Sequence, residues 1–242
     1  MSFVSGRQVL DMVPVQDHKR AYEGDLGENT GGMGSYSDAN GSLPFLSPRD
    51  LEQAHEITVR VAEAMEKETG VAYQGVMYGG FMAVKDGVRL IEYNARFGDP
   101  EAMNVLPILQ TDLVEVCEAI LGGNLHRVKV EFEKKATVCK YLVPNGYPDN
   151  AKAGEKIEIN PNFALQEGLK MYYSSVDQRE DGLYVSSSRA VAFVGTAETL
   201  EQAEKIAEAG CASVSGPVFH REDVGTKALI EKRVAMMRSL RA

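Results

Sequence analysis

The chain has 242 residues, of which 44% are hydrophobic and 25% are charged, so it can build a sizeable core and is not a disordered polypeptide. Its 35 acidic residues outnumber 26 Lys and Arg, which gives a net charge of −9, and no basic block indicates nucleic-acid binding. The longest apolar runs, such as residues 190–194, are far shorter than the roughly 18 residues of a membrane span, and residues 1–6 lack the apolar core of a signal peptide. We expect a soluble cytoplasmic protein that binds neither nucleic acid nor membrane.

The cysteines agree with this expectation. Cys117, Cys139 and Cys211 are odd in number and lack metal-binding spacing, so they predict neither a disulfide framework nor a zinc site. We expect all three to be buried free thiols.

The first third of the chain predicts a strand pair, a glycine-rich loop and a long helix. Residues 3–15 form two extended runs that turn at Gly6. Residues 17–38 are rich in Gly, Asp and Asn, which is typical of an ordered loop that bends sharply or approaches a ligand. Ser47 then offers a capping hydroxyl before a proline, and apolar residues recur at helical spacing until Gly70.

The middle of the chain predicts a β-hairpin and further helical segments. Residues 73–84 and 88–93 are extended runs joined by Lys-Asp-Gly, and Asp-Gly between apolar segments is a strong hairpin signal. A helix is expected to begin at residues 99–101, to be interrupted at Pro107 and to continue over residues 111–121.

The character of the sequence changes beyond residue 134. Strand-like runs are expected at residues 136–143, 156–159, 169–176 and 183–195, and helices at 199–209 and 226–240. The sequence therefore predicts an α+β fold with two domains, residues 1–130 and 131–242, divided at the charged stretch 126–135.

A pair of polar residues on the second hairpin strand suits a hard cation. Glu92 and Asn94 are two residues apart, so their side chains should lie on one face of the strand while Ile91 and Tyr93 face the other way. One carboxylate and one amide oxygen fit Mg²⁺, which fills its other positions with water and substrate phosphates. The alternative is an ordinary solvated strand face. We expect Arg96 on the same face and a helix that starts just after it. Both features would favour an anion nearby.

Two further segments could contact an anionic ligand. The motif QDHKR at residues 16–20 places several donors directly before the glycine-rich loop, and the motif NTGGMG at residues 29–34 offers backbone N–H groups to a phosphate or carboxylate. A charged turn and an ordinary glycine loop are the alternatives. Cys and Ser nucleophile constellations are absent, so the chemistry indicated is the electrostatics of phosphoryl transfer.

Together with EYNARFGDPE at residues 92–101, these motifs resemble the phosphoribosylamine–glycine ligases, a family of ATP-grasp enzymes of purine biosynthesis. The resemblance runs from about residue 3 to the motif HREDVG at residues 220–225. It implies most of the metal-bearing ATP-grasp subdomain, an antiparallel sheet with helices, followed by a smaller α+β C-terminal domain. It also implies that the family's N-terminal domain and lid are not part of this chain, so that a separate N-terminal half could be its partner and the chain alone would be inactive.

The resemblance assigns roles to individual residues. It implies that Glu92 and Asn94 bind Mg²⁺ or Mn²⁺ beside ATP, and that Arg96 is a catalytic residue that stabilises the transferred phosphoryl group. Less strongly, it implies that the glycine and phosphoribosylamine pocket is lined by a further set of residues: Lys19, Thr30, Gly31, Gly32 and Asp99. Some relatives carry an oxygen-bearing side chain twelve residues before the metal glutamate, where this chain has Gly80, so a second metal would have weaker support.

Two other functions remain open. One is another ATP-grasp carboxylate–amine ligase of purine synthesis, which would share the Glu92 and Asn94 pair but not the two earlier motifs. The other is a catalytically silent ligand-binding or assembly module.

Overall fold

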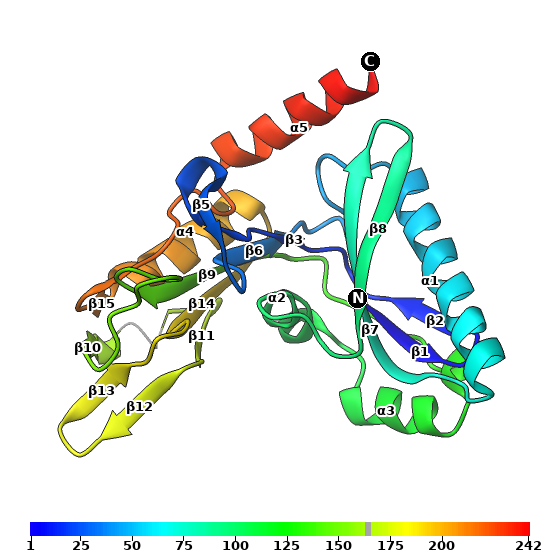
Figure 1. The fold of residues 1–242 in the computed structure, drawn as a ribbon, viewed down its shortest axis with the longest axis horizontal. Helices are drawn as coiled ribbons and strands as arrows, with labels where there is room; N and C mark the ends of the chain where they lie inside the picture. Colours follow the sequence, from blue (N-terminus) through cyan, green and yellow to red (C-terminus); the bar gives the residue numbers. More distant parts are fainter. Residues whose placement is uncertain (163–165) are drawn as a thin grey trace.

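The computed structural model describes residues 1–162 and 166–242, which build two main sheets on either side of the short helix α2 (Figure 1). The helices are α1 (Pro48–Thr69), α2 (Glu101–Val105), α3 (Leu113–Leu121), α4 (Leu200–Ala212) and α5 (Lys227–Arg241), with 3-10 turns η1 (Glu23–Asp25), η2 (Leu106–Ile108) and η3 (Leu125–Arg127). The strands are β1 (Ser2–Ser5), β2 (Gln8–Asp11), β3 (Gln16–Asp17), β4 (Arg20–Tyr22), β5 (Leu26–Asn29), β6 (Gly34–Ser37), β7 (Gln74–Val84), β8 (Gly87–Asn94), β9 (Ala136–Pro144), β10 (Lys156–Ile159), β11 (Leu169–Tyr173), β12 (Val176–Arg179), β13 (Gly182–Val185), β14 (Val191–Ala197), β15 (Val214–Ser215) and β16 (Val218–Phe219). Within the described ranges, no helix is both long and apolar enough to cross a lipid bilayer.

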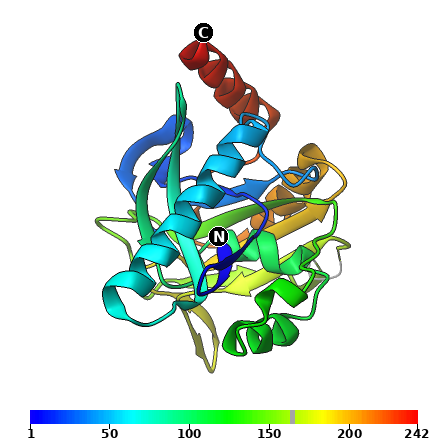
Figure 2. The same ribbon diagram turned by 90° about the vertical axis from the view of Figure 1, so that its right-hand side faces the viewer.

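The first sheet has the antiparallel order β2-β1-β7-β8 and is covered on both faces. Val4 of β1 packs in a buried cluster with Ala62 of α1, whereas its neighbour Phe3 packs with Val116 of α3. Successive strand residues point to opposite faces, so these two clusters place α1 and α3 on opposite sides of the sheet (Figures 1 and 2). The predicted strand pair and hairpin are both confirmed.

Helix α1 begins and ends where the sequence predicts. The Ser47 side chain accepts a hydrogen bond from the backbone N–H of Asp50, and the Asp50 carboxylate accepts one from the backbone N–H of Ser47 at 2.7 Å. Pro48 occupies the first turn, where its missing N–H costs nothing, and Gly70 ends the helix in the left-handed conformation at φ 72°.

The second sheet has the antiparallel order β11-β14-β9-β6-β3, and β16 pairs with the far end of β9. Strand β9 is buried along its whole length, and α4 covers one face, where Val138 packs with Ala203. Lys140 lies fully buried in β9, and its Nζ contacts the carboxylates of Glu204 at 2.7 Å and Glu208 at 2.5 Å on α4. Two carboxylates and a carbonyl therefore compensate a charge that would be costly alone.

Strands from both halves of the sequence share this second sheet. β3 and β6 precede the predicted boundary at residues 126–135, yet β6 pairs with β9, which follows it. The division into domains 1–130 and 131–242 stays a prediction.

Two of the predicted long strands are each divided in the structure. The predicted strand over residues 183–195 is divided into β13 and β14. The predicted strand over residues 169–176 is divided into β11 and the first residue of β12. Both divisions arise because β12, β13, β10 and β15 form a small sheet of their own. Serines bond locally at the break: the Ser186 hydroxyl donates to Ser175 at 2.7 Å and accepts from the N–H of Ser188. Such local bonds compete with a strand ladder.

The cysteine prediction is wrong at one position. Cys139 and Cys211 are buried free thiols as expected, but Cys117 is exposed. Helix α3 turns Val116 and Ile120 toward the core, which places residue 117 on its outer face.

Candidate functional site

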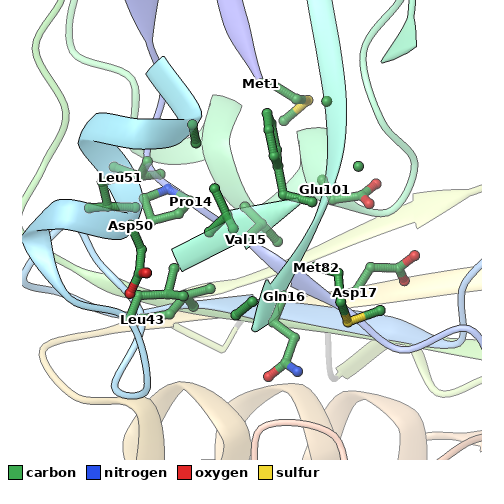
Figure 3. A pocket seen from close by; sticks show the side chains of 18 of the residues that line it. Met1, Pro14, Val15, Gln16, Asp17, Leu43, Asp50, Leu51, Met82 and Glu101 are labelled. Atoms are coloured by element: carbon green, nitrogen blue, oxygen red, sulfur yellow. The ribbon is translucent and has the colours of Figure 1, made fainter. Parts of the chain in front are cut away.

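A cavity of about 870 Å³ lies between the β2–β3 connection, the start of α1, the β7–β8 hairpin and α5 (Figure 3). Leu43 and Met82 line its apolar part, whereas Asp17, Glu92 and Glu101 line a polar part. Apolar walls with a few convergent charged groups are typical of small-molecule sites. The cavity is therefore the centre of the candidate site.

The predicted metal pair lies together on β8. The amide Nδ2 of Asn94 donates to Oε1 of Glu92 at 3.2 Å, so the two side chains share one face of the strand. Across the hairpin, Glu92 pairs with Gly80 and Asn94 with Tyr78. A Cβ at Gly80 would lie 3.6 Å from Cγ of Glu92, so residue 80 is next to the carboxylate but offers no oxygen.

This donor set fits an open Mg²⁺ or Mn²⁺ site. The carboxylate and the amide are hard oxygen ligands within reach of each other. Among the described residues, no cluster of three or more His, Cys, Asp or Glu side chains could hold a metal ion. An ion held by Glu92 and Asn94 would thus depend on water and substrate phosphates for its other ligands.

A β-bulge corrects the expected orientation of Ile91. Gly80 pairs with Glu92 but the next residue, Phe81, pairs with Leu90, so Ile91 is an extra residue in β8. Ile91 is 65% exposed and lines the cavity together with Glu92 instead of facing the other way. Tyr93 does face away as predicted, and its hydroxyl donates to Thr58 of α1 at 2.8 Å.

Arg96 lies in the bend after β8, not on the strand face as expected, because β8 ends at Asn94. Its side chain is exposed, and Nη1 donates to the carbonyl of Phe97 at 2.8 Å. The helix that follows, α2, has only five residues, so the predicted anion site at its N-terminus is not supported. The hydroxyl of Tyr78 donates to Glu101 of α2, and burial followed by the Glu101 charge raises the pKa of Tyr78.

The glycine-rich segment is ordered by the hairpin of β4 and β5 and by its own hydrogen bonds. The N–H of Thr30 donates to the carbonyl of Lys19 at 2.7 Å, and its hydroxyl oxygen accepts from the N–H of Gly32 at 3.0 Å. The N–H of Gly31 donates to the hydroxyl of Tyr147 at 3.3 Å. Three loop amides that could face an anion therefore already have protein partners.

Arg189, between β13 and β14, joins the loop to Asp99. Its Nη1 donates to the carbonyls of Gly31 at 3.1 Å, Gly32 at 3.2 Å and Asp99 at 3.1 Å, and its Nη2 lies 3.1 Å from the Asp99 carboxylate. The Tyr141 hydroxyl donates to the other Asp99 oxygen at 2.9 Å. Sequence reasoning missed Arg189, since it stands inside a run that reads as one strand.

Gly32 connects this cluster to the cavity. Its φ is +120°, and a Cβ there would lie 2.6 Å from Pro100 and 2.8 Å from Oδ1 of Asp17. Only glycine fits this close approach. Lys19 lines the cavity and its Nζ lies 2.6 Å from the Asp17 carboxylate. Arg189 bonds to Gly31, Gly32 and Asp99 next to it, and Thr30 joins this cluster through its hydrogen bond with Gly32.

The motif HREDVG, near the C-terminus, makes hydrogen bonds to the residues that follow β3. Arg221 is 1% exposed, and it donates to the carbonyl of Arg20 at 3.2 Å, to Asp25 at 3.2 Å and to both oxygens of Asp223 at 2.7 and 2.8 Å. These bonds hold the end of the QDHKR motif against the C-terminal half of the chain.

Two sequence profiles match the chain in succession. Residues 1–102 match the ATP-grasp (A) domain of phosphoribosylglycinamide synthetase, and residues 137–227 match the C domain of the same enzyme. The chain is 50% identical over 241 residues to a phosphoribosylamine–glycine ligase of Methanothermobacter thermautotrophicus, and 51% identical over 239 residues to one of Pyrococcus furiosus. These alignments cover 100% and 99% of the chain but 55% and 53% of the relatives, so the chain spans about half the length of the curated relatives it matches.

Solved structures agree with the sequence matches. The crystal structure of a phosphoribosylamine–glycine ligase from Thermotoga maritima superposes with a TM-score of 0.76 at 29% identity, covering 92% of this chain and 54% of that one. The biotin carboxylase domain of a Hydrogenobacter thermophilus 2-oxoglutarate carboxylase, solved with MgADP, superposes with a TM-score of 0.62 over 98% of this chain and 48% of that one. At 15% identity, the second likeness shows the ATP-grasp fold alone.

Proposed function

Because the chain belongs to the phosphoribosylglycinamide synthetase family, we propose that it supplies the metal- and substrate-binding part of an ATP-dependent ligase that joins glycine to 5-phosphoribosylamine. In this reaction a glycine carboxylate oxygen attacks the γ-phosphorus of ATP and ADP leaves. The amine of phosphoribosylamine then attacks the carbonyl carbon of the glycyl phosphate, and phosphate leaves to give glycinamide ribonucleotide.

The observation that carries this proposal is the position of Glu92 and Asn94, side by side on β8 where Glu92 lines the cavity. They would hold Mg²⁺ or Mn²⁺, which would neutralise charge on the β- and γ-phosphates of ATP. Arg96 lies three residues before Asp99 and has no carboxylate partner among the described residues. It would place its guanidinium against the transferred phosphoryl oxygens.

The substrate residues predicted from the sequence support the same assignment. Lys19 lines the cavity, and Gly32 packs directly against Asp17 at its polar end. We place glycine and phosphoribosylamine between Lys19 and the cluster that Arg189 forms with Thr30, Gly31, Gly32 and Asp99. Because the chain spans about half of its relatives, we also propose that turnover needs the remaining length of those proteins. Free thiols favour a reducing, cytoplasmic setting for it.

Mn²⁺ binding by the chain tests the proposal directly. Water relaxation enhancement should reveal weak Mn²⁺ binding that ADP strengthens, since an open site relies on phosphate oxygens. Glu92→Gln keeps the shape of the side chain but removes its charge, so it should abolish the enhancement, whereas Arg96→Ala should spare it. Glu115→Gln, on the exposed face of α3, is the matched control. Unchanged Mn²⁺ binding by Glu92→Gln would show that this strand face is merely solvated.

A further inference from the structure

Helix α5 connects the two main sheets across the cavity. It begins beside the second sheet, where Leu229 is buried and Ile230 packs against the cluster that contains Tyr36. From there it runs toward the tip of the β7–β8 hairpin (Figure 1). Met236 and Met237 both line the cavity, but Met236 is 50% exposed whereas Met237 is 5% exposed. The middle of α5 therefore forms a wall of the cavity and is covered by solvent on its outer side.

The contacts that hold α5 come from residues four apart along the helix, which share one of its faces: Leu229, Arg233, Met237 and Arg241. Arg233 pairs with the carboxylate of Asp25, and Arg241 pairs with that of Asp50. Within residues 234–240, Met237 alone is buried. Since so little apolar surface holds the last two turns of α5, their position depends on Arg241.

Arg241 ties the last turn of α5 to α1 and to the hairpin. Its Nη1 and Nη2 each donate to one carboxylate oxygen of Asp50 at 2.8 Å. Its Nε donates to the carbonyl of Val84 at 3.2 Å, and Nη2 also donates to that of Gly87 at 3.4 Å, at the two ends of the β7–β8 turn. A guanidinium that binds a carboxylate through two nitrogens fixes direction as well as distance. These four bonds are named the Arg241 latch.

The carboxylate that receives Arg241 is already held by α1. Oδ2 of Asp50 also accepts from the backbone N–H of Ser47 at 2.7 Å and from its hydroxyl at 2.8 Å. The negative charge lies in the first turn of α1 and the positive charge of Arg241 lies in the last turn of α5, where the helix dipoles favour each. Asp50 lines the cavity, so water reaches its carboxylate once Arg241 withdraws (Figure 3). The latch can therefore open without leaving a buried charge unpaired.

We propose that α5 is a strap over the cavity and that release of the Arg241 latch opens the cavity to its ligand. This inference rests on the proposed function for the ligand, a nucleotide with its metal ion, and adds a control of its entry. With the latch closed, Met237 faces the cavity and α5 covers it. With the latch open, the last two turns lose their polar anchor, while the ion pair of Arg233 with Asp25 keeps the first half of the helix in place.

Thiol labelling at the strap tests this proposal without any ligand. Met237→Cys, in a Cys117→Ser background, places a thiol on the buried face of α5, where the aromatic disulfide DTNB reaches it only when the strap lifts. The remaining cysteines, Cys139 and Cys211, are buried. Arg241→Met should speed the labelling of this thiol at least about tenfold, because charge-assisted bonds to a buried carboxylate are lost.

Matched variants separate the latch from other effects. Arg238→Met removes an exposed charge from the same turn of α5 and should leave the labelling rate of Met237→Cys unchanged. Asp50→Asn keeps the side-chain shape for the Ser47 cap but weakens the latch, so it should speed labelling in the same direction as Arg241→Met. Met236→Cys, on the exposed side, should label rapidly with or without the latch. Melting temperatures above the labelling temperature confirm that each variant is folded.

Two results would overturn the strap: labelling of Met237→Cys as fast as that of Met236→Cys while the latch is intact, or parent-like labelling in the folded latch variants. Release of methylanthraniloyl-ADP bound with Mn²⁺ tests the link to the ligand, since it should be about tenfold faster in Arg241→Met. Equal release rates would overturn the control of entry. A parent chain that binds neither Mn²⁺ nor this nucleotide would refute the proposed function, whereas the labelling rates would still decide whether the latch controls the cavity.

Discussion

Arg189 should control the order of the substrate loop although it stands far from that loop in the sequence. One guanidinium donates to three backbone carbonyls, those of Gly31, Gly32 and Asp99, and pairs with the Asp99 carboxylate. It also stacks over the ring of Tyr141, with Cζ 4.4 Å from the ring centre. Arg189→Met removes all of these bonds while keeping a side chain of similar length.

The cost can be worked from the exposure of each bond. The bond to Gly32 is partly buried and involves a charged donor, so its loss should cost about 1.5 kcal/mol. The bonds to Gly31 and Asp99 are exposed, and the half-exposed Asp99 carboxylate is screened by water, so they add roughly 1 kcal/mol together. Arg189→Met should therefore destabilise this region by about 2–3 kcal/mol.

Hydrogen exchange provides the assay. Amides of residues 29–34 should exchange roughly 30-fold or more faster in Arg189→Met, because about 2 kcal/mol corresponds to that factor in a local opening equilibrium. Arg189→Lys keeps the charge but not the three-way contact, so it should lie close to Arg189→Met. Arg7→Met, which removes only an exposed ion pair with Glu66, is the matched control. Exchange at residues 29–34 that matches the parent chain in Arg189→Met would refute the reasoning.

Two further predictions concern buried charges. Folding raises the pKa of Asp17 from 3.8 to about 6, so the folded chain keeps this proton to a higher pH than the unfolded chain. Ionisation of Asp17 therefore lowers the free energy of unfolding as the pH rises from about 4 to about 6. Asp17→Asn should match the parent in urea unfolding below pH 4 and exceed it by roughly 1–3 kcal/mol above pH 6; a constant difference at all pH values would contradict this. Arg221→Met should cost about 3–5 kcal/mol in urea unfolding, because it leaves Asp25 and Asp223 without their buried partner. Arg7→Met should stay within about 0.5 kcal/mol of the parent, and equal effects of the two changes would refute a structural role for Arg221.

Local patterns predicted the elements that local chemistry decides. Ser47, Gly70 and the Asp-Gly turn before β8 act within a few residues, so the helix and the hairpin follow from the sequence. The alternation that placed Glu92 beside Asn94 also holds, but the bulge at Ile91 depends on pairing with β7 and has no local signal.

Long-range contacts account for what sequence reasoning missed. Arg189 reaches the loop only because β14 and β6 both pair with β9, and no spacing rule reveals that juxtaposition. Asp17 and Glu101 stand in the QDHKR and EYNARFGDPE motifs, yet their shared burial depends on the tertiary fold. The motifs therefore predicted a candidate site, which stays a prediction, whereas the contacts that hold its residues in place required the structure.

Glycine-dependent ADP formation tests the central claim most directly. A chimera in which this chain replaces the matching 241 residues of the Methanothermobacter thermautotrophicus relative, to which it is 50% identical, supplies the remaining length of that enzyme. We predict ADP release that requires both glycine and phosphoribosylamine and that is lost in the chimera with Glu92→Gln. A folded chimera that releases no ADP with both substrates, or whose ADP release survives Glu92→Gln unchanged, would contradict the account.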